Sequence, residues 1–221
     1  MDVWKIIKKE MSMKNIFFAA SVTLISSIAF GQKYPEPEFS NEIYYLKKDS
    51  SILVRLEKGT SKMDTKMKMA GIGGSESGYE MDGERSTTRL TNGTGLSFIF
   101  SNSMAASSSS NAKRDSMMRA NGVDPSMMQD MMQPSNMITL YKADADKEKR
   151  KVYLQKSGGM FSSHKNQSSD KYTFSVKKIR DGYWELLVDK SLPKGEYIFT
   201  MMGMGMGNMD GSMSLFAFAV D

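Results

Sequence analysis

Methionine is the residue type whose number and spacing in this chain could support chemistry. The sequence has 22 methionines among 221 residues, and it has no cysteine. The methionines gather at 117–118, 127–132 and 201–209. Thioether sulfur is a soft ligand that suits Cu(I) and Ag(I), so the densest group is a candidate metal site. Its ligands would be Met201, Met202, Met204 and Met206.

Two other interpretations of the methionines stay open. Methionine is a flexible apolar side chain that fills gaps in a core without any metal. Exposed methionine is also oxidised reversibly to the sulfoxide, so it can scavenge oxidants. We therefore expect no cofactor as the first interpretation and keep Cu(I) as the alternative.

Catalytic patterns are scarce in this sequence. His164 is the single histidine, and it lies in a serine- and glutamine-rich stretch with no nucleophile or carboxylate at a telling spacing. The glycine-rich stretch 71–74 lacks the Lys-Ser/Thr that a nucleotide-binding loop needs. Asp144 and Asp146 lie in a predicted turn, where solvated charge is the ordinary interpretation. We expect that the protein is not an enzyme and assign no catalytic residue.

Residues 13–32 have the pattern of a secretory signal peptide. Lys14 is followed by the apolar stretch 16–28, which is too short to span a bilayer comfortably, and the small residues Ala29 and Gly31 suit a signal peptidase. Residues 1–31 would then be an N-terminal extension and cleaved signal, with Gln32 as the first mature residue. We expect an exported protein that is periplasmic, or outer-membrane-associated or extracellular.

Composition narrows the class of protein further. Without cysteine, an exported domain must rely on its hydrophobic core instead of disulfides. No apolar run of about 18 residues follows the signal, so we expect no transmembrane helix in the mature chain. The formal net charge of +5 is small and dispersed, which predicts no nucleic-acid partner.

Alternation of apolar and polar residues with frequent turn signals predicts an all-β fold. Turn dipeptides stand at 82–83, 92–93 and 181–182. The last stretch, 212–220, is apolar in both phases, so we expect a central strand buried on both faces. The predicted architecture is an antiparallel β-sandwich or a partly open barrel. Strands are expected at 41–46, 52–58, 62–69, 79–81, 87–90, 96–100, 137–141, 151–155, 172–176, 183–188, 196–201 and 212–220.

A serine- and methionine-rich stretch interrupts this pattern at 102–136. It lacks alternation and large branched side chains, which predicts a long disordered linker. One short helical turn is expected at 125–132, with Asp124 as N-cap and Pro125 as the first helical residue. The expected organisation is a first β-unit at 32–101, the linker at 102–136, and a second β-unit at 137–221 that packs with the first as one domain.

The two β-units also align with each other. Residues 43–58 resemble 138–156, and 90–100 resemble 192–199. A real duplication predicts two β-units related by a pseudo-twofold axis. Leu56 and Leu154 would then be equivalent and both buried, and Phe100 would be equivalent to Phe199. A chance alignment of common strand and turn residues is the alternative.

Three tracts, PEPEF at 35–39, GGSESGYE at 73–80 and GEYIF at 195–199, resemble a group of uncharacterised secreted proteins of Gram-negative bacteria. The resemblance covers most of residues 32–221 and omits the serine- and methionine-rich stretch. It implies export and a β-rich fold, and it assigns no site residue.

These observations together predict an exported, non-catalytic binding or structural module of the bacterial envelope. Its partner would be an unknown envelope protein or ligand. The alternative is a methionine-rich periplasmic protein that binds Cu(I) or Ag(I).

Overall fold

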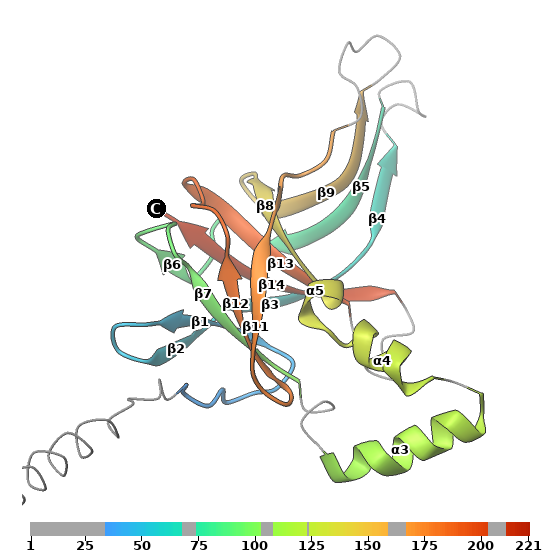
Figure 1. Ribbon diagram of the computed structural model, residues 1–221. Helices are drawn as coiled ribbons and strands as arrows, with labels where there is room; N and C mark the ends of the chain where they lie inside the picture. Colours follow the sequence, from blue (N-terminus) through green and yellow to red (C-terminus); the bar gives the residue numbers. More distant parts are fainter. Residues whose placement is uncertain (1–33, 68–73, 103–107, 123, 159–166, 203–210) are drawn as a thin grey trace, which may run out of the picture. The chain divides into compact units, whose positions relative to one another are not determined.

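Two antiparallel β-sheets make up the fold in the computed structural model (Figure 1), and the predicted all-β class is confirmed. The structure describes residues 34–67, 74–102, 108–122, 124–158, 167–202 and 211–221. Residues Pro35–Asp221 form one unit, to which everything below refers. Its strands are β1 (Ile43–Lys47), β2 (Ile52–Arg55), β3 (Glu57–Lys62), β4 (Asp64–Met67), β5 (Gly74–Asp82), β6 (Arg89–Leu90), β7 (Ser97–Ser101), β8 (Ile138–Ala145), β9 (Lys149–Gly158), β10 (Lys171–Tyr172), β11 (Phe174–Arg180), β12 (Tyr183–Val188), β13 (Gly195–Met202) and β14 (Ser212–Val220).

The smaller sheet has the strand order β11-β12-β7-β1-β2. The larger sheet has the order β3-β14-β13-β8-β9-β5-β4, with β10 paired to β8 and β6 paired in parallel to β14. The larger sheet curls until β3 approaches β5. There, the amide of Glu80 donates a hydrogen bond of 3.1 Å to the hydroxyl of Ser61. This hydrogen bond to a side chain links β3 to β5, which no backbone ladder joins.

The larger sheet carries buried apolar side chains on both faces. One face packs against the smaller sheet through aromatic side chains such as Phe98, Phe199 and Phe218. The other face, which we call the inner face of the curl, carries a second apolar cluster. That cluster consists of Met81, Tyr141, Ala143, Val152, Ile198, Leu215 and Ala217, with Tyr79 and Met213 packed against it. The prediction of a central last strand buried on both faces is confirmed by β14.

The predicted strand 52–58 is divided between the two sheets. β2 pairs with β1 in the smaller sheet, whereas β3 pairs with β14 in the larger one. Leu56 lies between them and is 2% exposed. The chain changes sheets at this residue, which anchors the crossing in the core.

The segment predicted as a disordered linker contains helices. They are α3 (Ser108–Ala120), α4 (Pro125–Met131) and α5 (Pro134–Met137). The predicted turn at Pro125 is confirmed, because the carboxylate of Asp124 accepts a hydrogen bond of 2.9 Å from the Ser126 amide. The prediction of disorder is wrong for these residues. Met137, only 7% exposed, packs into the core between the sheets.

Within the described ranges, no helix combines the length and the apolar character that crossing a membrane requires.

The residue equivalences of the predicted duplication are wrong. The orders β7-β1-β2 and β13-β8-β9 do match. However, Phe100 pairs with Ile43, whereas Phe199 pairs with Leu140, which is shifted by two residues from the alignment. Leu154 is 36% exposed.

A β-bulge explains the exposure of Leu154. Gly78 on β5 pairs with Tyr153, and Ser77 pairs with Gln155. Leu154 is the extra residue between these pairs, so the inward and outward alternation of β9 changes phase there. The alternation that buries Val152 on the inner face therefore does not continue to Leu154.

Candidate functional site

Strands β8 and β9 separate soon after the hairpin that joins them. Their ladder holds only two pairs, Asp144 with Lys151 and Ala145 with Arg150. Beyond these pairs, the segment 167–172 lies between the two strands. It pairs with β8 through β10, and Gln167 bridges to Lys156 on β9. We call this segment the wedge.

Hydrogen bonds fix the wedge on both sides. The Lys142 amide on β8 donates to the carbonyl of Asp170 at 2.9 Å. On the β9 side, the Ser169 amide donates to the carbonyl of Tyr153 at 2.8 Å, and the Ser169 hydroxyl accepts from the Tyr153 amide at 2.9 Å. The backbone groups that the split would leave unpaired are thus satisfied by the wedge.

A polar cavity of about 370 Å³ lies where the wedge meets the two strands. This volume falls within the roughly 300–1,000 Å³ of small-molecule sites. The cavity lies on the face of β8 opposite the inner face, since Lys142 alternates with the inward Tyr141 and Ala143. Its lining residues are Lys142, Asp144, Tyr153, Lys156, Gln167, Ser168, Ser169 and Asp170.

Three charged side chains of the cavity have no hydrogen-bond or ion-pair partner among the residues that the structure describes. They are Lys142, Asp144 and Asp170. Lys142 is half-buried and crosses Gly195, where a Cβ atom would lie 2.9 Å from Lys142 Cε. Gly195 has a φ of +153°, a conformation that favours glycine. The absence of a side chain at 195 therefore leaves the path of Lys142 open.

The rest of the lining adds an aromatic ring and neutral polar groups. The ammonium of Lys156 lies 4.4 Å from the centre of the Tyr153 ring and 3.9 Å from a carboxylate oxygen of Glu76. Two lysines and two aspartates give the cavity no dominant sign of charge. Donors and acceptors are mixed, which suits a neutral ligand with several hydroxyl groups better than an anion or a cation.

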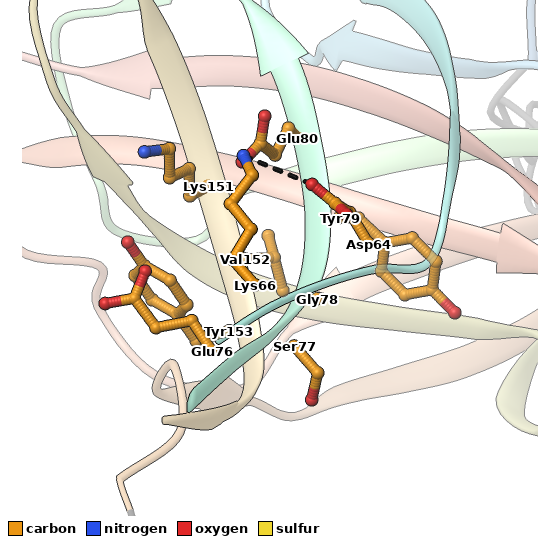
Figure 2. A pocket seen from close by; sticks show the side chains of 10 residues that line it. All are labelled: Asp64, Lys66, Glu76, Ser77, Gly78, Tyr79, Glu80, Lys151, Val152 and Tyr153. Atoms are coloured by element: carbon orange, nitrogen blue, oxygen red, sulfur yellow. Dashed lines mark hydrogen bonds and ion pairs between the residues drawn. The ribbon is translucent and has the colours of Figure 1, made fainter. Parts of the chain in front are cut away.

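A smaller hollow lies next to this cavity, over strands β4, β5 and β9 (Figure 2). Its volume is about 20 Å³, which is room for roughly one water molecule. Lys66 forms an ion pair with Asp64 at 3.1 Å (Figure 2). It also forms an ion pair with Glu80, whose other oxygen binds Lys149 at 2.7 Å. The charges here already satisfy one another, so this hollow is not the candidate site.

Hydrogen bonds from lysine side chains also lower the pKa values of two carboxyl groups on β5 and in the β8–β9 turn, Glu80 and Asp146. The hydrogen bonds from Lys149 and Lys66 lower the pKa of Glu80. The hydrogen bond from Lys151, helped by two backbone amides, lowers the pKa of Asp146 to about 2. Both carboxylates stay ionised near neutral pH.

Arg150 is a buried cation on β9 that the sequence analysis did not single out. Its side chain is 0% exposed, and it donates to the carboxylate of Glu57 at 2.6 and 3.0 Å. It also donates to the hydroxyl of Ser86 and to the carbonyls of Asp82 and Gly83 at 2.7 to 2.9 Å. Every donor direction is occupied, so Arg150 holds the 82–88 loop against the sheet and offers nothing to a ligand.

A cavity of about 520 Å³ lies between the β1–β2 turn and residues 89–96. Its Arg89 is already bound to Asp221 and, at 3.3 Å, to Glu196. Its Lys47, at the end of β1, and its Asp49, in the turn, are both exposed. In the cavity beside the wedge, Asp144 and Asp170 are exposed too, but Lys142 is half-buried on a central strand, and we take this cavity as the candidate site on that ground.

Of the four predicted metal ligands, the structure describes Met201 and Met202 and places them on opposite faces of β13. Met201 is 5% exposed and packs into the core between the sheets, whereas Met202 is 61% exposed. Adjacent residues of a strand point to opposite faces, so these two cannot share one ion. Met204 and Met206 lie outside the described residues, as does His164. In the described part of the chain, no three carboxylate or imidazole side chains are grouped as a metal site.

Comparison with known proteins found no match among family models, curated proteins or solved structures.

Proposed function

We propose that this chain is an exported, non-catalytic binding module of the bacterial envelope, whose ligand is a small hydroxyl-rich molecule such as a saccharide. Export is supported by the signal-peptide pattern of residues 13–32. The binding site would be the cavity beside the wedge.

One observation carries this proposal. The cavity gathers Lys142, Asp144 and Asp170, and none of their side chains has a hydrogen-bond or ion-pair partner among the described residues. Hydrogen bonds from backbone to backbone hold the wedge at this place, so the backbone that carries Asp170 is fixed before a ligand arrives. A ligand with several hydroxyl groups can donate to the carboxylates and accept from the ammonium.

The proposal is tested by titrating a panel of mono- and disaccharides into the purified chain and following backbone amide shifts by NMR. We expect at least one saccharide to shift the amides of Lys142, Tyr153 and Ser169. Asp170→Asn and Lys142→Met should each weaken binding at least about tenfold, because each removes a charged hydrogen-bonding group. The matched control is Asp49→Asn with Lys47→Met in the larger cavity, which should leave the affinity unchanged.

No shift with any saccharide would contradict the proposed ligand class. Equal weakening by the control pair would contradict the proposed site. The export component has its own measurement, which is the N-terminal sequence of the protein recovered from the envelope fraction. A chain that begins at Gln32 is expected, and an uncleaved chain in the cytoplasm would contradict export.

A further inference from the structure

The inner face of the curl ends in a group of methionines that differs from the predicted set. Met202 on β13 pairs directly with Met213 on β14. Directly opposed residues of an antiparallel pair point to the same face, with their Cβ atoms about 5 Å apart. Met213 packs against the apolar cluster of the inner face, so Met202 points to that face too.

Met63 reaches the same end of the curl from the other side. The next residue, Asp64, pairs with Gly78, so continuing the register by one residue sets Met63 opposite Tyr79. Tyr79 packs against the same inner cluster as Met213. Met63 also follows Ser61 by two residues, and Ser61 pairs with Met213. Both relationships put Met63 on the inner face beside Met213.

The three side chains have room to rearrange around a ligand. Met63 is 58% exposed, Met202 is 61% exposed, and Met213 is half-buried. The carboxylate of Asp64 binds Lys66 at 3.1 Å on the opposite face. The hydroxyl of Ser61, which pairs with Met213, already accepts a hydrogen bond from the Glu80 amide. Three neutral thioethers at the edge of an apolar cluster match a soft monovalent cation and do not match Mg²⁺ or Ca²⁺.

We propose that Met63, Met202 and Met213 form a thioether site for Cu(I) or Ag(I) at the open end of the inner face. The site uses β13, β14 and the residue between β3 and β4, and it is separate from the saccharide cavity, which lies on the opposite face. No electron transfer is involved, because the cation binds in the monovalent state in which it is supplied.

The experiment is a titration of the purified chain, carrying ¹³C-labelled methionine methyl groups, with Ag(I), followed by an anaerobic Cu(I) competition against a chromogenic chelator. We expect the methyl signals of these three residues to shift together. Met63→Leu combined with Met202→Leu should weaken Ag(I) binding at least about tenfold, as loss of ligands does elsewhere. Leucine has a similar volume, so the fold should be retained, and circular dichroism checks this.

The matched control is Met117→Leu combined with Met127→Leu. These residues are 68% and 65% exposed on α3 and α4, so the control removes two thioethers of equal accessibility. We expect it to bind Ag(I) as the unchanged chain does. Equal weakening in both double variants, or no weakening in the first, would overturn the site. Either result would leave the saccharide proposal standing, because that proposal depends on other residues.

Discussion

The carboxylate of Glu57 on β3 accepts two hydrogen bonds from the buried guanidinium of Arg150 on β9, at 2.6 and 3.0 Å. β3 and β9 are not neighbours in the larger sheet, whose order separates them by three strands. The ion pair therefore crosses the curl and ties together parts of the sheet that the backbone ladder does not join.

Replacing Glu57 by Gln should lower the free energy of unfolding by about 3 kcal/mol, because a buried cation loses its counter-charge. Urea denaturation measures this change. The control is Glu36→Gln, which removes the partner of the exposed Arg180 and should change stability by less than about 1 kcal/mol. Similar small changes in both variants would show that the hydrogen bonds from Arg150 to Ser86 and the two carbonyls suffice.

The ion pair between Glu57 and Arg150 should also make the free energy of unfolding depend on pH in the acid range. Burial raises the pKa of Glu57, but the hydrogen bonds from Arg150 and the Thr87 amide lower it by more, so its pKa lies below the ordinary 4.5. A carboxylate with a lowered pKa stabilises the fold above its unfolded-state pKa, and the effect is lost as pH falls through the folded-state pKa. We expect the free energy of unfolding to decrease below pH 4.5. This decrease should be shallower in Glu57→Gln, and an identical pH profile in the two proteins would refute the assignment.

Gly78→Ala should disrupt the bulge. A Cβ atom at residue 78 would lie 1.9 Å from the carbonyl oxygen of Val152, and backbone cannot move aside as a flexible side chain can. We expect a loss of at least about 2 kcal/mol in the free energy of unfolding. Gly59→Ala is the comparison, because its Cβ atom would meet only the flexible side chain of Met81, at 3.2 to 3.4 Å. Thermal unfolding of both variants should rank Gly78→Ala as clearly the less stable.

The segment 134–137 should behave as core and not as linker. Met137→Ala removes a side chain that is 7% exposed in the core, which should cost about 2 to 5 kcal/mol. Met117→Ala removes a side chain that is 68% exposed on α3 and should change stability by less than about 0.5 kcal/mol. Chemical denaturation of the two variants compares them directly, and equal stabilities would mean that α5 is not anchored.

Local patterns were sufficient to predict the fold class and the strand β14. In that strand, aromatic and small apolar residues alternate, and the residues on both of its faces are buried. This local pattern is sufficient to predict a strand in the centre of a sheet. The N-cap at Asp124 was predictable for the same reason, since it depends only on residues next to it.

Features that depend on distant partners could not be predicted. The phase change at Leu154 depends on the register between β9 and β5, which are far apart in sequence. The same is true of the cavity, because nothing near residues 167–172 indicates that they will enter the gap between β8 and β9. The alignment of the two halves compared residue types alone, so it assigned Leu154 to a buried position that this register does not provide.

The last strand of the curled sheet, β4, has only four residues, and all four are exposed. Its edge presents unpaired backbone groups that could recruit a strand from another molecule. Asp64 and Lys66 stand at that edge, and a strand added there would pack beside their charges and their mutual ion pair. Such short, charged edges disfavour edge-to-edge aggregation. The charged side chains of β4 thus disfavour pairing at the edge of a sheet whose next strands, β5 and β9, are long.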